Sequence, residues 1–259
     1  MARSKKNPKS RSCRLFLAPQ ATDRPLGPGD EVQLEAGELE HASRVLRLPV
    51  GATVEILDGR GGRASAELIG DRRVRGVRLT TAMATAPLAG EPGSSRPHIE
   101  LLMPPPRGAR FETLLDRAAQ LGAARLRPLI CKHTGPEDRG ARRDRHARVL
   151  REACKQSGNL QLPELEPLAS LDEALSEAPR PLFYLEPLAD LSLPKALEAQ
   201  GVLPRLSVAA GPEGGFTTEE RRSLTEADAI AVRLAPHILR IETAVEASLS
   251  VVVAWGLDT

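Results

Sequence analysis

Two loops near the C-terminal end of the chain place glycine, proline and charged residues at spacings that could hold and react a ligand. The first loop, Gly211-Pro212-Glu213-Gly214-Gly215-Phe216, follows the apolar run 206–210. The second loop follows the apolar run 230–234 and reads Pro236-His237-Ile238-Leu239-Arg240-Ile241-Glu242-Thr243. Each run is short enough for a buried strand, and each loop leads into a helical pattern. Thr217 and Glu220 have the spacing of a capping box, which predicts where the first of these helices starts.

Glycine loops of this kind let a ligand approach the backbone closely, and ligands of parallel α/β sheets bind at the carboxyl ends of the strands. No Lys-Ser or Lys-Thr pair follows the glycines, and the pattern is not Gly-x-Gly-x-x-Gly, so a phosphate cradle is not expected. Backbone groups between apolar walls suit an uncharged, adenosine-like group. An ordinary turn followed by a buried helix would explain the same residues, and the loop alone leaves both interpretations open.

Together the two loops closely resemble the C-terminal signature of the family that methylates N3 of a decoding-centre uridine in 16S ribosomal RNA. That family belongs to the SPOUT class of S-adenosylmethionine-dependent RNA methyltransferases. Further segments match the family in order along most of the chain: Arg14-Leu15-Phe16, His41 to Arg47, Gln120-Leu121-Gly122, and Glu152-Ala153-Cys154-Lys155-Gln156-Ser157-Gly158.

The resemblance implies that S-adenosyl-L-methionine is the cofactor and that no metal is required. It places around the cofactor Leu185, Gly211, Glu213, Gly214, Gly215, Leu234, Ile238, Leu239 and Arg240. Methyl transfer to a nitrogen is an in-line displacement in which the protein mainly positions two partners, and a base or cation helps the uridine N3 proton to leave. We expect Arg240 and Glu242 to be the catalytic residues. The alternative is that Glu242 and Thr243 only cap the last helix.

Several positions depart from the family pattern. Asn159 and Gln161 stand in a segment where the family usually has arginines, and His133 and His237 stand where it often has arginine. We expect these positions to face RNA or a second subunit. They leave open two alternatives: a SPOUT methyltransferase that acts on another RNA nucleotide, and a non-catalytic RNA-binding or ribosome-assembly factor of the same fold.

Basic residues are clustered although the net charge is only +2, from 36 Lys and Arg against 34 Asp and Glu. Six lie between residues 3 and 14 with no acid among them, and six arginines lie between residues 139 and 151. Such clusters attract a polyanion through counterion release. Ribosomal RNA is therefore the expected partner, with contacts from Arg14, Arg142, Arg143 and Arg145. A flexible tail and a solvated helix face are the plainer alternative.

The first third of the chain has mainly β patterns. Short runs at 14–18, 30–34, 52–57, 64–69 and 74–81 are separated by glycine-rich turns, and only 38–47 looks helical. This pattern predicts a small β-barrel with one helix, and the resemblance implies a PUA-like barrel that helps to bind RNA. We expect a basic flexible arm at 1–12, the RNA-binding barrel at 13–85, a Pro- and Gly-rich linker at 86–97, and a SPOUT methyltransferase domain at 98–259.

The remainder alternates apolar runs with helical patterns, which predicts an α/β domain with a parallel sheet and helices on both faces. Strands are expected at 98–103, 125–130, 181–185, 206–210 and 230–234, and helices at 110–121, 141–157, 217–227 and 245–255. Patterning by itself favours an unknotted chain, because connections rarely thread through loops. The resemblance instead implies a C-terminal trefoil knot and a homodimer.

The composition favours a cytoplasmic protein that does not enter the membrane. No apolar run reaches the roughly 18 residues that a membrane helix needs, and no signal-type apolar core follows the N-terminus. Cys13, Cys131 and Cys154 are unevenly spaced and include no Cys-x-x-Cys pair. Neither a disulfide framework nor a zinc site is therefore expected.

Overall fold

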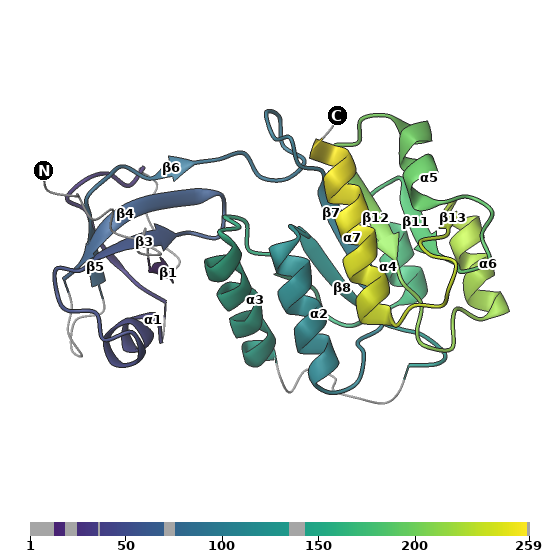
Figure 1. Cartoon of the computed structure of the whole chain (residues 1–259), viewed down its shortest axis with the longest axis horizontal. Helices are drawn as coiled ribbons and strands as arrows, with labels where there is room; N and C mark the ends of the chain where they lie inside the picture. The colour runs from purple at the N-terminus through teal and green to yellow at the C-terminus, as the bar shows by residue number, and fades with distance from the viewer. Residues whose placement is uncertain (1–12, 19–24, 36, 70–75, 135–142, 258–259) are drawn as a thin grey trace, which may run out of the picture. The chain divides into compact units, whose positions relative to one another are not determined.

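The structure, a computed structural model, describes residues 13–18, 25–35, 37–69, 76–134 and 143–257. The chain divides into two compact units, Met1–Ala86 and Pro87–Thr259 (Figure 1). The basic arm expected at 1–12 lies outside the described residues. The functions expected of the two units, RNA binding and methyl transfer, stay predictions at this point.

A small mixed sheet forms the first unit. Its strands are β1 (Arg14–Phe16), β2 (Glu31–Gln33), β3 (Thr53–Leu57), β4 (Gly62–Leu68), β5 (Gly76–Leu79) and β6 (Ala84–Thr85). The order is β1-β3-β4-β5-β2, with β6 on β4, and only the β1–β3 pair is parallel. Buried and more accessible residues alternate along β4, as expected for a strand with one face on a core.

The outer strands of this sheet meet at one end. Leu17 and Leu34 form an isolated antiparallel bridge, and Glu35 N donates to Phe16 O at 3.0 Å. A closed barrel is not established by these contacts, so the PUA-like barrel stays a prediction. The core beneath the sheet is aliphatic and includes Leu15, Val32, Ile56, Leu68 and Val77.

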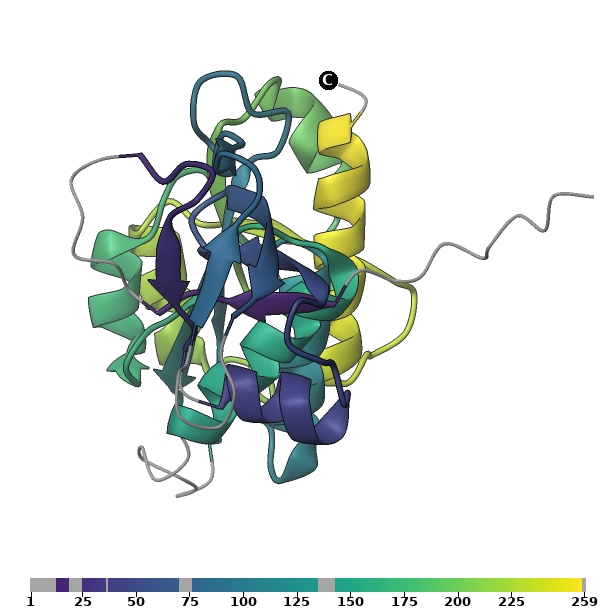
Figure 2. The same ribbon diagram turned by 90° about the vertical axis from the view of Figure 1, so that its left-hand side faces the viewer.

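The helix expected at 38–47 is shorter and wider than an α-helix of that length. It starts as α1 (Glu38–Glu40) and continues as the π-helix η1 (His41–Val45), where His41 O accepts from Leu46 N, five residues on. Arg47, in the left-handed region at φ 54°, ends it. The helical segment lies at one end of the strands (Figure 2).

The second unit is a parallel sheet between helices. Its strands are β7 (His98–Met103), β8 (Arg125–Ile130), β9 (Glu164–Leu165), β10 (Ala169–Ser170), β11 (Leu182–Leu185), β12 (Arg205–Ala209) and β13 (Ile230–Val232). They run in the order β10-β8-β7-β12-β11-β13, with β9 on β8, and every pair is parallel. The prediction of a parallel α/β sheet is therefore confirmed.

Helices lie on both faces of this sheet. They are α2 (Ala109–Gln120), α3 (Arg143–Ser157), α4 (Leu171–Glu177), α5 (Leu193–Gln200), α6 (Thr218–Glu226) and α7 (Ile241–Leu257). Helix α2 contacts α3 and α7, and α7 contacts α5; α3, α2 and α7 stand side by side in Figure 1. Helices α4 and α6 cover the other face, where Leu175 and Leu224 pack with the strand residues Leu102 and Leu182.

The described strands β7 and β8 have the predicted bounds, and α2 begins and ends one residue before the prediction. Two differences matter. The last helix begins at Ile241 rather than Val245. The short helices α4 and α5 and the two-residue strands β9 and β10 were not predicted. The strand pairings do not establish the trefoil knot, which stays a prediction.

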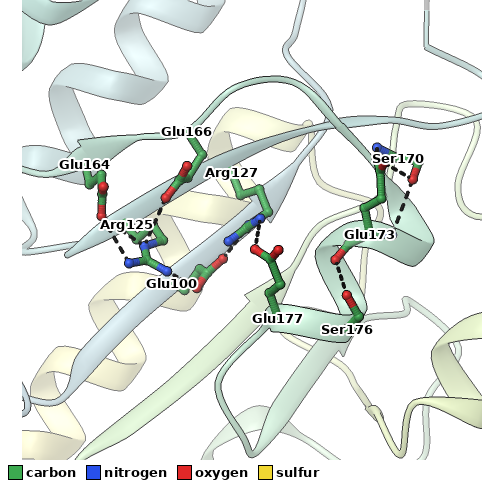
Figure 3. A network of polar contacts seen from close by, with 9 residues as sticks. All are labelled: Glu100, Arg125, Arg127, Glu164, Glu166, Ser170, Glu173, Ser176 and Glu177. Atoms are coloured by element: carbon green, nitrogen blue, oxygen red, sulfur yellow. Dashed lines mark hydrogen bonds and ion pairs between the residues drawn. The ribbon is translucent and has the colours of Figure 1, made fainter.

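An ionic network that is buried at Glu100 and Arg127 joins β7, β8 and α4 (Figure 3). Glu100 is fully buried, and its Oε1 accepts from Arg127 Nε at 2.8 Å. Arg127 Nη1 also donates to Glu177 Oε2 of α4 at 2.8 Å. Burial raises the pKa of Glu100, and the hydrogen bond and charge of Arg127 oppose that shift. Arg127 therefore stabilises a carboxylate that has no access to water.

Candidate active site

Three adjacent strands end at one edge of the second unit and place three loops together. Strand β11 lies between β12 and β13, and the parallel strands end at Leu185, Ala209 and Val232. The loops that follow enclose a cavity of about 390 Å³, within the usual range for a small-molecule site. Its lining comprises Leu185, Glu186, Pro187, Leu188, Ala210, Gly211, Pro212, Glu213, Gly214, Gly215, Phe216, Arg221, Val232, Leu234, Ala235, Pro236, His237, Ile238, Leu239, Ile241 and Ala244.

The glycine loop after β12 is a tight turn that leaves little room for side chains. Gly215 N donates to Pro212 O at 2.8 Å, and Gly215 has φ +72°, a region that favours glycine. A Cβ on Gly211 would come within 3.2 Å of the ring of Phe216, which is itself buried. A Cβ on Gly214 would come within 2.9 Å of His133 Nδ1. The glycines therefore permit this turn and keep its backbone accessible to a ligand.

The start of α6 fixes the far end of the glycine loop. Thr217 and Glu220 form both hydrogen bonds of the predicted capping box, so that prediction is confirmed. The second carboxylate oxygen of Glu220 accepts from Lys132 N at 2.8 Å, and His133 Nδ1 lies 3.3 Å from Gly215 O. The segment after β8 is thus bound to the glycine loop by two polar contacts.

The loop after β11 carries a charged pair. Glu186 N donates to Val232 O at 3.0 Å, which holds this loop against the end of β13. The Glu186 side chain is 17% exposed, and its Oε2 lies 3.0 Å from Arg221 Nε of α6. Leu188, in the same loop, is 89% exposed. A neutralised ion pair and an exposed aliphatic side chain thus line the same cavity.

The loop after β13 supplies the apolar wall. Leu234, Ile238 and Leu239 line the cavity together with Pro236. Ile238 is 83% exposed, although it is a large aliphatic residue. Apolar side chains that face an open cavity rather than the core are typical of a ligand site.

The structure brings together all of the residues predicted to hold the cofactor except Arg240. Leu185, Gly211, Glu213, Gly214, Gly215, Leu234, Ile238 and Leu239 line the cavity. Arg240 is exposed and immediately precedes α7, where its carbonyl accepts from Ala244 N at 2.8 Å. Leu239 and Ile241, which precede and follow Arg240 in the sequence, both line the cavity.

The second predicted catalytic residue, Glu242, lies in the first turn of α7 and does not line the cavity. Because the helix begins at Ile241, neither Glu242 nor Thr243 occupies the position before its first residue, where a capping side chain would stand. Glu242 Oε2 is buried and has no hydrogen-bond partner among the described residues. A buried carboxylate oxygen without a hydrogen-bond donor lowers the stability of the fold. The Glu242 oxygen is therefore available to a donor from outside the described residues.

Of the arginines expected to contact RNA, Arg142 lies outside the described residues. Arg14 Nε forms an ion pair with Glu55 at 2.7 Å across β1 and β3. Arg145 contacts Glu112 of α2 through Nε at 2.7 Å and Nη2 at 2.8 Å. Arg143 is exposed at the start of α3. RNA contact by these arginines stays a prediction, and Arg145 has a second role in joining α3 to α2.

Two departures from the family pattern have structural roles. Asn159 Nδ2 donates to Ala119 O at 3.0 Å, and its Oδ1 accepts from Gln161 N at 3.1 Å. Gln161 Oε1 accepts from Ala89 N at 2.9 Å. We expected both positions to face RNA or a partner, but their partly buried side chains bind the backbone of their own unit. His133 and His237 are exposed, and His237 lines the cavity.

The sequence pattern missed the contribution of the loop after β11. Glu186, Leu188 and Arg221 line the cavity although none belongs to either glycine- or proline-marked loop. A carboxylate directly after a buried strand is a signal that could have been used for Glu186. No comparable signal identifies Arg221, because it pairs with Glu186 of a different loop, which lies far from it in the sequence.

In the part of the chain that the structure describes, the chemistry near the cavity is limited by a buried thiol and by the lack of a metal-binding cluster. Cys131 lies close to the glycine loop, but burial raises the pKa of its thiol to about 12 and the nearby Glu220 adds to the shift. No cluster of His, Cys, Asp and Glu within the described ranges could hold a metal ion. None of the helices in those ranges is long and apolar enough to cross a membrane.

Comparisons with known proteins agree on one family. The sequence model of the RNA methyltransferase domain matches residues 94–253. The "Ribosomal RNA small subunit methyltransferase E" of Synechocystis is 26% identical over 223 residues, covering 85% of this chain and 71% of that protein. A Legionella pneumophila protein solved with the bound cofactor SAM has a TM-score of 0.82 at 25% identity, covering 95% of this chain and 98% of the other.

A second solved structure is similar over almost its whole length. The ribosomal RNA small subunit methyltransferase E of Neisseria gonorrhoeae, bound to S-adenosyl methionine, has a TM-score of 0.77 and is 25% identical. The similarity covers 92% of this chain and 95% of that one. Both described units are therefore included in the likeness.

Proposed function

The chain belongs to the RNA methyltransferase domain family, and from this membership we propose that it methylates N3 of a decoding-centre uridine in 16S ribosomal RNA. It is an RNA methyltransferase that depends on S-adenosyl-L-methionine. The observation that carries the methyl-transfer part of this proposal is the three-loop cavity, because all of the residues expected to surround the cofactor except Arg240 converge on it from separate parts of the chain.

The lining of the cavity fits S-adenosyl-L-methionine. Its volume of about 390 Å³ suits a small molecule, and the apolar side chains of the loop after β13 suit a flat base. The glycine loop offers backbone groups without intervening side chains. Glu213, at 53% exposure, lies 3.6 Å from Arg110, so its carboxylate is only loosely paired and can face a cationic part of the ligand.

The reaction needs few groups from the protein. When bound, the cofactor supplies a methyl group on a positively charged sulfur. In the proposed reaction the bond between that sulfur and the methyl carbon breaks, a bond from uridine N3 to the methyl carbon forms, and the N3 proton passes to a base or to water. Arg240 stabilises the anion that forms on the uracil ring, since it is an exposed cation between two residues, Leu239 and Ile241, that line the cavity. Glu242, with one unpaired buried oxygen, orders the same site.

The substrate and assembly are further parts of the proposal. The relatives' names specify the small-subunit ribosomal RNA, and we assign the same substrate class to this chain. We propose that the first unit helps to bind this RNA, that the protein works in the cytoplasm, and that two chains form a homodimer. Methylation of another nucleotide is the second candidate, because Asn159 and Gln161 are engaged within their own unit instead of presenting basic side chains to RNA.

Mass-spectrometric mapping of 16S RNA from cells with and without the gene tests this proposal. We expect one uridine methylated at N3 to be lost with the gene and restored by the purified protein and S-adenosyl-L-methionine. Arg240→Ala should lower the single-turnover rate while leaving cofactor affinity close to that of the parent, because Arg240 acts mainly on the transition state. Cofactor binding without any methylated RNA product would instead support the non-catalytic alternative, and a product at another position would support the second candidate.

A further inference from the structure

The loop after β11 holds the middle position among the three loops of the cavity. Strand β11 pairs with β12 on one side and with β13 on the other. The glycine loop with Glu213 therefore lies on one side of Glu186, and the apolar loop with Ile238 lies on the other. A ligand that spans the cavity from the apolar wall to the glycine loop must place its central portion near Glu186.

The carboxylate of Glu186 is held in place and still has acceptor capacity. Its Oε2 lies 3.0 Å from Arg221 Nε, and its Oε1 lies 3.5 Å from Leu188 N. An ionised carboxylate has about four lone-pair positions, so about two remain for a ligand. The side chain is mostly buried, which limits competition from water.

The charge of the pair selects the kind of donor. Arg221 neutralises Glu186, and the same guanidinium would repel a sulfonium or an ammonium group placed beside it. Glu213 is more exposed and more distant from its arginine, at 3.6 Å, so it suits the cationic end of a ligand better. A neutral group with two neighbouring hydroxyls matches the acceptors that Glu186 retains.

We propose that Glu186, oriented by Arg221, accepts hydrogen bonds from the ribose hydroxyls of the cofactor and so selects ribonucleoside ligands over their deoxy forms. The ribose is the central portion of S-adenosyl-L-methionine, between the adenine and the methionine group, as the order of the three loops requires. This assignment rests on the proposed cofactor function of the cavity.

Calorimetry with a set of neutral ligands tests the assignment without any methyl transfer. The probes are 5′-methylthioadenosine and its 2′-deoxy and 3′-deoxy derivatives, which lack the amino-acid group of the cofactor. For the parent protein, removal of a hydroxyl that contacts Glu186 should weaken binding by roughly ten- to a hundredfold, the effect of a hydrogen bond to a charged group. Glu186→Gln should bind 5′-methylthioadenosine more weakly and should lose less than about threefold further on deoxygenation.

The control is Glu226→Gln, which alters an exposed carboxylate of α6 that is paired with Arg222 at 3.6 Å. This variant should keep the parent's discrimination between the ribose and deoxyribose forms. If Glu186→Gln is too unstable to measure, the parent's series of ligands still decides, since equal affinities for all three would overturn the proposal.

Other outcomes have distinct meanings. Equal deoxygenation losses in the parent and in Glu186→Gln would show that another group binds the hydroxyls and would overturn the assignment. Weaker binding of S-adenosyl-L-methionine by Glu186→Gln, with unchanged binding of 5′-methylthioadenosine, would place Glu186 at the amino-acid end and would overturn it as well. A parent protein that binds neither compound would contradict the proposed function itself.

Discussion

The glycines of the cavity act mainly through the side chain that they lack. Gly215 is needed for its positive φ, whereas Gly214 is needed because its missing side chain leaves the loop backbone open beside His133. The first requirement concerns backbone strain and the second concerns access. Substitution at Gly214 therefore separates ligand binding from folding better than substitution at Gly215 does.

We expect Gly214→Val to abolish binding of S-adenosyl-L-methionine and to change the thermal unfolding temperature little. A Cβ at this position would lie 2.9 Å from Nδ1 of the exposed His133 side chain, which can move aside, but the branched side chain would then occupy the cavity edge. Calorimetry measures the affinity. Gly27→Val is the matched control, because a Cβ on Gly27 has open space within 4 Å.

Unchanged cofactor affinity of Gly214→Val would show that the glycine loop is only a turn. If Gly214→Val lost both cofactor affinity and several degrees of thermal unfolding temperature, the loss of binding could follow from loss of folding. That result would contradict the view that Gly214 serves ligand access and not backbone conformation. The same pair of measurements on Gly27→Val shows how much of any change is due to valine itself.

Among the elements, β7, β8 and α4 are joined by the ionic network rather than by apolar contacts alone. Arg127 lies between Glu100 of β7 and Glu177 of α4, and Arg125 contacts Glu164 and Glu166 beside them (Figure 3). Glu100 is fully buried, so its ionised form is stabilised by these arginines and not by water. Such a pair is costly to break, even where its formation adds little net stability.

We expect Arg127→Leu to lower the free energy of unfolding at neutral pH by roughly 3–5 kcal/mol, because it leaves Glu100 buried without its main partner. Burial already raises the pKa of Glu100, and loss of Arg127 would raise it further. A carboxyl group with a raised folded-state pKa loses stability as pH rises from its unfolded value through its folded value. The deficit relative to the parent should therefore shrink as pH falls toward about 4, the ordinary range for glutamate.

Urea unfolding of the parent and the variant across this pH range measures the effect. Arg222→Leu is the control, because its ion pair with Glu226 is exposed on both sides and should contribute less than about 1 kcal/mol. A deficit for Arg127→Leu that grew toward acid pH would contradict the burial argument.

At the scale of the whole molecule, RNA binding should be separable from cofactor binding. The cavity lies at the edge formed by β11, β12 and β13, whereas α3 stands beyond α2 on the other side of α7 (Figure 1). Arg143 and Arg148 are exposed on α3, while Arg145 is paired with Glu112. These exposed arginines are the described members of the basic cluster best placed to contact phosphate.

We expect the double change Arg143→Ala and Arg148→Ala to weaken RNA binding and to reduce the salt slope by roughly 0.7 to 0.9 per lost phosphate contact. Cofactor affinity should not change. Binding titrations of a 16S RNA fragment at several salt concentrations measure the slope. Arg222→Ala on α6 is the control for loss of an exposed arginine elsewhere. If the double variant had the same salt slope as the parent, α3 would be a solvated helix face that does not contact RNA.

Much of the local structure follows from the sequence alone. The apolar runs at 98–103 and 125–130 form strands with those bounds, and Thr217 and Glu220 form the capping box that their spacing predicts. These features depend on neighbouring residues only, through side-chain periodicity and the unpaired backbone groups of a helix end. The glycine loop is also a local feature. The cofactor could be expected from family resemblance because the residues of the family signature lie in two short segments.

Tertiary structure alone decided which distant residues meet. The seven-residue α4 was not predicted, although Ser170 and Glu173 form a capping box at its start, because a helix this short also needs tertiary packing to be stable. The pairing of Glu100 with Arg127 depends on the register between β7 and β8, which no local pattern specifies. Likewise, Glu186 meets Arg221 only because β11 lies between β12 and β13. Sequence patterns determined the longer elements and the two marked loops, while strand order determined the third wall of the cavity and the charges within it.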